Sequence, residues 1–184
     1  MPSMPDLVSL RQSIWQGEYT AAHAVEQAIA RALSPACAGA LVHFTPERAR
    51  EQARRVDAAL AAGAPLPPLA GLAFTVKDLF DVAGEFTLAG SRVLTDAAPA
   101  AAHAPAVARL LAAGGSLLGR THMVEFAFSG VGTNPHWPAP AAWDGRYDAP
   151  VGEAGAPCVP GGSSSGAAVS VASGAAWVGL GSDT

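Results

Sequence analysis

Two short apolar segments on either side of a helical one place the strongest constraint on the fold of this chain. The apolar segments are residues 72–76 and 116–119, and the helical pattern between them covers residues 105–113. Short apolar runs next to Gly and Pro are typical of buried strands. A strand, a helix and a strand at this spacing favour parallel pairing, so we predict an α/β fold with a parallel or mixed sheet.

The chain before these segments has the periodicity of helices. Apolar residues recur at helical spacing over residues 6–16, 20–33 and 46–62. Thr20 and Thr45 are suited to cap the starts of the second and third helices, and Gly17 and Gly63 to end the first and third. Between the second and third helices, residues 41–45 predict a short strand.

The last third of the chain combines an irregular segment with a run of small residues. Residues 130–160 are rich in Pro, Gly, Trp and Asp and show no periodicity, which predicts a long loop. The block GGSSSG, residues 161–166, follows and leads into residues 165–173, whose small side chains favour a closely packed helix. Residues 176–180 then predict another buried strand.

Composition and charge exclude several classes of function. The chain has 184 residues, half of them hydrophobic, and a formal net charge of −4. A nucleic-acid-binding surface is not expected, because phosphate neutralisation requires clustered Lys and Arg. Arg48, Arg50, Arg54 and Arg55 recur at helical spacing beside acidic residues, which predicts a solvated helix face instead.

Membrane insertion, disulfides and metal binding are not expected either. No apolar run is long enough to span a bilayer, and the amino terminus lacks a secretory signal, so a cytoplasmic protein is predicted. Cys37 and Cys158 lie far apart in the sequence. The five histidines show neither metal-ligand spacing nor the order of a Ser-His-Asp triad.

Lys77 is the only lysine in the chain, against ten arginines. It lies within the apolar run GLAFTVKDLF, where a lysine is not needed for solvation. Burial there would lower the pKa of the amine, whereas Asp78 would raise it if its carboxylate pointed inward. Lys77 is therefore a candidate for chemistry on the residues alone.

The GGSSSG block allows three interpretations. A flexible linker is disfavoured because the block runs into AAVSVASGAAWVGLG, which carries no solvating charge. A phosphate-binding loop is disfavoured because the Lys-Ser/Thr ending of a nucleotide-binding loop is missing. In the third interpretation, the glycines permit unusual backbone angles and the serines present hydroxyl groups at fixed positions.

Several segments together resemble the amidase signature family of serine hydrolases. They are FTVKDLFDVAG, LAGSR, LLGRTHMVEFAFSGVGTNPHW, PGGSSSGAAVSVASG and GLGSDT, in this order over residues 69–184. The resemblance implies an α/β amidase fold, here incomplete, with a mixed sheet flanked by helices on both faces. It also implies one domain, with a helical start in residues 1–65 and a catalytic core segment in residues 66–184.

By this resemblance, Lys77 corresponds to the family's catalytic lysine and Ser163 to its serine after a cis peptide bond. Ser164 corresponds to a supporting serine, Asp183 to a buried structural acid and Thr184 to a contributor of backbone near the oxyanion hole. The family's nucleophilic serine lies in a Gly-Gly-Ser after Gly-Ser-Asp-Thr. It is therefore expected about three residues beyond Thr184, and the chain as given is expected to be inactive.

The resemblance also suggests residues of the substrate cleft. Met123, Phe126 and Phe128 lie in the segment that borders the cleft in the family, although an ordinary core role is an alternative for the two phenylalanines. The long loop departs from the family pattern by additional residues, DGRYDAPVGEAGAP, at positions 144–157. Because of this departure, the sequence does not identify the substrate.

The function implied is hydrolysis of a carboxamide C–N bond to a carboxylic acid and ammonia or an amine, through an acyl-enzyme. No cofactor and no metal are implied. The expected partner is a small-molecule amide, with neither nucleic acid nor membrane and with a homodimer possible. One alternative is the amidase subunit of a glutamyl-tRNA(Gln) amidotransferase, and another is a non-catalytic fragment or interaction module.

Overall fold

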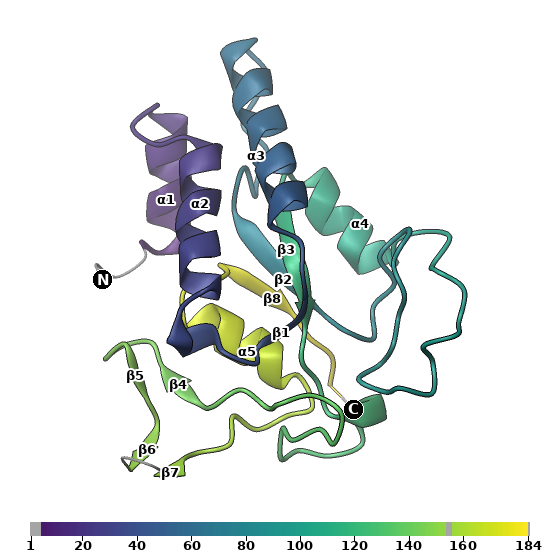
Figure 1. Ribbon diagram of the computed structural model, residues 1–184. Helices are drawn as coiled ribbons and strands as arrows, with labels where there is room; N and C mark the ends of the chain where they lie inside the picture. Colours follow the sequence, from purple (N-terminus) through teal and green to yellow (C-terminus); the bar gives the residue numbers. More distant parts are fainter. Residues whose placement is uncertain (1–4, 154–155, 184) are drawn as a thin grey trace.

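A mixed β-sheet forms the centre of the molecule (Figure 1). The computed structural model describes residues 5–153 and 156–183. Within these residues the central sheet has four strands in the order β1-β3-β2-β8, namely β1 (Leu41–Phe44), β2 (Ala73–Lys77), β3 (Ser116–Thr121) and β8 (Val178–Leu180). Strand β2 is parallel to both β3 and β8, whereas β1 is antiparallel to β3. The predicted α/β fold with a mixed sheet is confirmed.

The helices agree with the sequence periodicity to within a few residues. They are α1 (Leu7–Trp15), α2 (Ala21–Ala32), α3 (Pro46–Ala61), α4 (Pro105–Ala112) and α5 (Ser165–Ala172), with short 3-10 turns η1 (Pro35–Cys37) and η2 (Glu125–Ala127). Thr20 caps α2 by accepting a hydrogen bond from the backbone N–H of His23. Gly17 and Gly63 have φ angles of +72° and +82°, the left-handed conformation that ends a helix.

Thr45 does not cap α3 in the predicted way. Its hydroxyl donates to the carbonyl of Leu118 in β3, 3.2 Å away, and makes no capping bond to α3. Helix α3 instead begins at Pro46, which lacks an N–H and therefore leaves one fewer donor to satisfy. The tertiary contact with β3 is the reason that the local prediction failed here.

Helices cover both faces of the sheet. On one face, Phe74 and Val76 of β2 pack in a buried cluster with Val107 of α4. The residues that alternate with these along β2 face the other side of the sheet. There, Ala73 packs with Val25 of α2 and with α3 (Figure 1). This alternation follows from the two-residue period of a strand, and it confirms the predicted arrangement of helices on both faces.

Helix α5 lies unusually close to the strands because its contacts involve small residues. Thr75 of β2 and Ser170 of α5 share a hydrogen bond of 2.9 Å. Gly179 of β8 has no room for a side chain because the carbonyl of Ala167 lies against it. The close approach brings the start of α5, and with it the GGSSSG block, to the end of β2.

The basic face of α3 is solvated only in part. Arg50, Arg54 and Arg55 form ion pairs with acidic side chains on or near the surface, as the sequence predicts. Arg48 differs, because it pairs with the buried carboxylate of Glu85. Asp57 also turns inward and accepts from the first backbone N–H groups of α2.

The long loop contains two short antiparallel ladders that the sequence did not predict. They are β4 (Trp143–Asp144) with β5 (Ala149–Pro150), and β6 (Gly152–Glu153) with β7 (Ala156–Pro157). Two-residue strands are too short to produce a detectable alternation of polar and apolar residues. The first ladder is attached to α2 by an ion pair of 3.0 Å between Asp148 and Arg31.

Candidate active site

The amine of Lys77 is enclosed between two serine hydroxyl groups. Lys77 is the last residue of β2, and its side chain is fully buried. Its Nζ donates to Ser163 Oγ at 2.6 Å and to Ser182 Oγ at 2.8 Å. Burial lowers the pKa of Lys77 below its ordinary value of 10.5, because the charged amine loses solvation. The site therefore shifts the amine toward its neutral form while it stays in contact with two hydroxyls.

Ser163 is presented to this amine by the glycines that precede it. The peptide bond between Gly162 and Ser163 is cis, as the family resemblance implies. Gly161 has a φ angle of +76°, and Gly162 lies so close to Gly132 that a side chain there would force its neighbours to shift. The third interpretation of the GGSSSG block, in which glycines shape the backbone and serines present hydroxyls, agrees with this geometry.

A cavity of about 940 Å³ opens at the hydroxyl of Ser163. It is lined by residues 126–130 and 160–164 together with Ala168, Ser182 and Asp183. The side chain of Ser163 is thus shared between the interior, where it meets Lys77, and a cavity large enough for a small organic molecule. This is the arrangement that a proton relay between a substrate and a buried base requires.

Two of the three predicted cleft residues line this cavity. Phe126 and Phe128 are 51% and 93% exposed and lie on its wall. Met123 does not, because it is only 1% exposed and lies in the interior against Gly90. The segment turns sharply between them, since Phe126 and Ala127 both have positive φ angles, so that Met123 and the phenylalanines face different surroundings.

The three predicted supporting residues have different outcomes. Ser164 contacts Ser182, accepting from its backbone N–H and donating to its carbonyl at 3.2 Å each, so that the block is joined to the segment after β8. Asp183 is exposed at the cavity, whereas the sequence predicted a buried acid. Thr184 lies outside the described residues.

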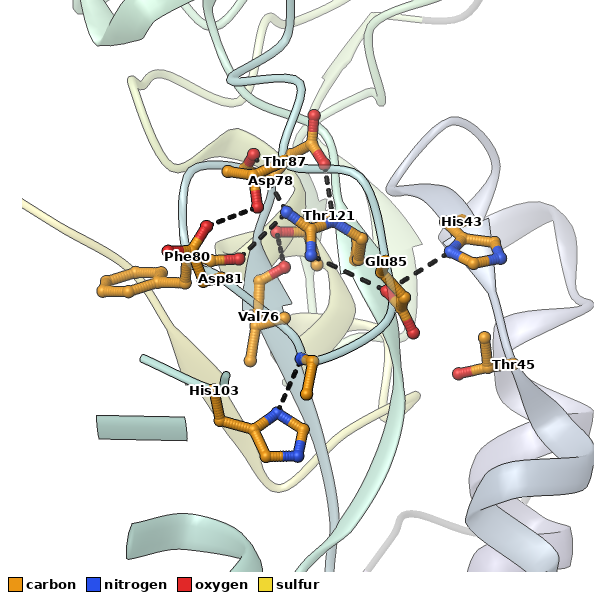
Figure 2. A network of polar contacts seen from close by, with 12 residues as sticks. His43, Thr45, Val76, Asp78, Phe80, Asp81, Glu85, Thr87, His103 and Thr121 are labelled. Carbon is orange, nitrogen blue, oxygen red and sulfur yellow. Dashed lines mark hydrogen bonds and ion pairs between the residues drawn. The ribbon is translucent and has the colours of Figure 1, made fainter. Parts of the chain in front are cut away.

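Asp78 pairs with Arg120, not with Lys77. Its Oδ1 accepts from Arg120 Nε at 2.7 Å, and its Oδ2 accepts from the backbone N–H of Gly90 at 3.1 Å. Arg120 also lies 3.6 Å from Glu85, which contacts His43 (Figure 2). Asp78 and Arg120 are both buried, so the charge of each is balanced by the other. Burial is then the cause of the lowered pKa of Lys77.

Three segments meet at Glu125, just before the exposed phenylalanines. The Oε1 atom of Glu125 accepts from Ser91 Oγ at 2.6 Å and contacts His136 Nε2 at 2.9 Å. These contacts with Ser91 and His136 lower the pKa of the Glu125 carboxyl. Sequence reasoning did not find this group, because its members are separated by up to 45 positions and follow no periodic pattern.

Sequence reasoning also missed a role for Ser182 and His122. Ser182 was not among the candidate residues, yet its hydroxyl is the second partner of Lys77. The signal available was its place in GLGSDT, directly after a predicted strand that lies beside β2. His122 was set aside as one of five scattered histidines, but it is fully buried beside the GGSSSG block.

Comparison with known proteins shows relatives along most of the chain. The family model described as Amidase matches residues 23–184. AtzE, which belongs to the 1-carboxybiuret hydrolase of Pseudomonas sp. (strain ADP), is 39% identical over 180 residues, which is 96% of this chain and 37% of that protein. A glutamyl-tRNA(Gln) amidotransferase subunit from Synechococcus sp. (strain WH7803) is 38% identical over 177 residues, 95% of this chain and 34% of that protein.

Solved structures show the same relationship in three dimensions. One, described as a vestigial protein complex that reveals the origins of an s-triazine catabolic enzyme, has 37% sequence identity and a TM-score of 0.86. It covers 98% of this chain, and this chain covers 37% of it. The chain thus spans little more than a third of the length of these relatives. On both its sequence and its structure, the chain belongs to the amidase family, the amidase signature serine hydrolases.

Proposed function

We propose that the protein containing this chain hydrolyses a carboxamide C–N bond to a carboxylic acid and ammonia or an amine, through an acyl-enzyme. The observation that carries the proposal is the 2.6 Å contact between Lys77 Nζ and Ser163 Oγ at the edge of the cavity. A buried lysine with a lowered pKa is a base that is more readily available than an ordinary lysine, and a hydroxyl can pass a proton to it.

In this proposal, Lys77 and Ser163 form a proton relay. The attacking serine is the one expected after Thr184, and its proton moves to the hydroxyl of Ser163 while the proton of Ser163 moves to Lys77. The same path in reverse protonates the leaving amine as the acyl-enzyme forms. Water then attacks the ester and releases the acid, again with Ser163 and Lys77 carrying the proton.

The neighbouring residues receive supporting roles in the proposal. Ser164 holds the block to the segment after β8 by its two contacts with Ser182. Phe126 and Phe128 provide an apolar wall of the cleft for part of the amide substrate. Met123 is assigned to the core beneath that wall. Asp183 and the backbone of Thr184 are proposed to lie near the oxyanion hole.

A fluorophosphonate probe tests this function, because it labels an activated serine. We expect the protein with the serine that follows Thr184 to be labelled at that serine, and labelling to be lost in Lys77→Met and Ser163→Ala. Ser13→Ala on α1, remote from the cavity, is the matched control and should be labelled like the wild type. Labelling that persists in both site variants would refute the relay.

A second candidate is the amidase subunit of a glutamyl-tRNA(Gln) amidotransferase. It is favoured by the 38% identity with subunits of such amidotransferases, over 95% of this chain. Such a protein would release ammonia from an amide and deliver it to another member of the complex. Ammonia release from glutamine that rises when candidate partner proteins are added would support this function, whereas hydrolysis of other small amides without any partner would support the stand-alone amidase.

The proposal also covers the partners of the protein and its cellular compartment. Among the residues described, no helix combines the length and the apolar character needed to cross a membrane. We propose a small-molecule amide as the substrate, no direct nucleic-acid partner, and a homodimer as a possible assembly. Cys37 and Cys158 are free thiols, which is compatible with the reducing environment of the cytoplasm, where we place the protein.

A further inference from the structure

His122 lies directly behind the GGSSSG block. It follows the last residue of β3 and is fully buried. Its Nδ1 is 2.8 Å from the hydroxyl of Ser165, which is 1% exposed and is the first residue of α5. His122 does not line the cavity, so it reaches the site only through its neighbours.

The backbone of His122 holds the same turn of α5. Its carbonyl accepts from the N–H of Gly166 at 2.9 Å, and its own N–H donates to the carbonyl of Ala40. Gly166 is packed so closely against Ala40 and His122 that a side chain would not fit there. Both the side chain and the main chain of His122 therefore bind the first turn of α5 at a defined position.

The segment that begins at His122 also contacts Ser163 itself, through Val124. The N–H of Val124 donates to the carbonyl of Ser163 at 3.1 Å. Residues 122–124 thus run beside residues 163–166 and hold them from Ser163 to Gly166. Ser164, the residue before α5, makes no side-chain capping bond to the helix, so its start relies on contacts from outside.

We propose that His122 is a positioning residue that holds the hydroxyl of Ser163 against Lys77, by fixing Ser165 and the start of α5. Its catalytic consequence rests on the proposed amidase function, but its geometric effect does not. The glycines before Ser163 permit many backbone conformations, and a fixed neighbour on the other side removes that freedom. Without it, the 2.6 Å contact with Lys77 would loosen and water would reach the amine.

The imidazole acts here as a neutral hydrogen-bonding group. Burial lowers the pKa of His122, and the carbonyl of Trp137 acts in the opposite direction with a smaller effect. A neutral ring can share one proton with the hydroxyl of Ser165 and still use its other nitrogen as a donor or acceptor. An asparagine side chain could replace the nitrogen nearest the backbone, whereas a glutamine side chain would place its amide beyond it.

Lys77 provides a direct readout because it is the only lysine of the chain. Lysine labelled with ¹³C at Cε and ¹⁵N at Nζ gives one side-chain NMR signal, assigned by its loss in Lys77→Met. The titration of that signal reports how strongly the amine is shielded from water. No substrate is needed, so a failure of the proposed hydrolysis leaves this test intact and can be told apart from a failure of the positioning role.

The test compares variants of His122 and Ser165 in the 184-residue chain. His122→Ala and Ser165→Ala should each raise the pKa of Lys77 toward its ordinary value, by more than about half a unit. His122→Asn should keep the wild-type titration, and His122→Gln should behave like His122→Ala. The double variant should shift no further than either single variant, because both remove the same contact.

His23→Ala on the exposed side of α2 is the matched control and should leave the lysine signal unchanged. Thermal unfolding shows which variants remain folded. If His122→Ala does not fold, Ser165→Ala and the pair His122→Asn and His122→Gln carry the test. Folded variants that lose the His122–Ser165 contact and still titrate like the wild type at Lys77 would overturn the proposal.

Discussion

Around Lys77, three features decide what the amine can do. It is fully buried, it donates to the hydroxyls of Ser163 and Ser182, and the nearest acid in sequence, Asp78, is occupied by Arg120. Burial disfavours the ammonium form, and the carboxylate of Asp78 does not restore it. Burial, with Asp78 paired to Arg120, therefore supports a lysine that gives up its proton more readily than a lysine in water.

The lowered pKa of Lys77 predicts a specific pH dependence of stability. Because the amine has a lower pKa in the folded than in the unfolded chain, the unfolded state binds more protons between the two values, and stability rises with pH there. Lys77→Met removes this dependence. The variant should gain stability relative to the wild type at neutral pH, and the gain should shrink as the pH approaches 10.5.

Urea unfolding of the wild type and of Lys77→Met at pH 7 and near pH 10 checks this pH dependence. Every other titrating group is common to the two proteins. The difference in the free energy of unfolding should amount to about 1.4 kcal/mol for each unit by which the pKa is lowered. The loss of the contacts between the amine and the two hydroxyls lowers the free energy of unfolding of the variant by an amount that does not change with pH. A difference that does not change with pH would contradict a lowered pKa for Lys77.

At the scale of elements, one helix start is held by a residue from another helix in addition to its own cap. That residue is Asp57 of α3, whose two carboxylate oxygens accept from the N–H groups of Ala21 and Ala22 at 2.7 and 2.9 Å. A carboxylate at a helix start satisfies donors that have no partner within the helix and favours the positive end of its dipole. Asp57 therefore joins α2 to α3.

Asp57→Ala should lower the free energy of unfolding by about 1–2 kcal/mol, because two amide donors at the start of α2 lose their acceptor. Asp57→Asn retains one acceptor oxygen and should lose less. Asp96→Ala, an exposed acid outside any helix, is the control. Denaturant unfolding measures all three, and equal stabilities for Asp57→Ala and Asp96→Ala would show that the cap contributes nothing.

Glu125 holds one wall of the cleft through contacts with two other segments. Through Ser91 and His136 it anchors the segment that carries Phe126 and Phe128. Glu125→Ala should increase amide hydrogen exchange in residues 126–130, because their local opening loses its main polar anchor. In the active enzyme, KM should rise more than kcat falls. Unchanged exchange in these residues would remove Glu125 from the cleft wall, and Glu153→Ala provides the surface control.

The sequence predicts elements well and contacts between elements poorly. The helices follow from periodicity, because each buries one face, whereas the strands follow from short apolar runs, of which β2 and β3 are buried throughout. Lys77 was identified as the only amine among the side chains, and Ser163 by the resemblance of the glycine-rich block to the amidase signature family. The role of Ser182, the second partner of the amine, was signalled only by its place in GLGSDT. The group around Glu125 could not be predicted, since it depends on how distant segments meet.

At the scale of the whole molecule, a buried charge network connects the sheet to α3. Arg120 of β3 pairs with Asp78 after β2, donates to the carbonyl of Phe80, and approaches Glu85 (Figure 2). Glu85 also binds Arg48 of α3. Removing only one partner of a buried ion pair strongly destabilises a protein, because the other charge then remains without compensation. The network therefore couples several elements to the position of β2.

Arg120→Met should destabilise the protein by about 3–5 kcal/mol, a large part of the roughly 5–15 kcal/mol typical of a folded domain. The double variant Arg120→Met with Asp78→Asn should recover part of the loss, because the uncompensated carboxylate is gone. Thermal or urea unfolding of the single and double variants measures this. A double variant as unstable as the sum of the two single variants would show that the pair is not coupled.

The central claim is that Lys77 and Ser163 together carry protons during amide hydrolysis. The most direct measurement is the pH dependence of kcat for an amide substrate in the protein that contains this chain and the serine expected after it. We predict hydrolysis that requires a deprotonated group with a pKa below that of an ordinary lysine, and a loss of about 10²–10⁴-fold in kcat for both Lys77→Met and Ser163→Ala. Wild-type rates in either variant, or a rate independent of that ionisation, would contradict the account.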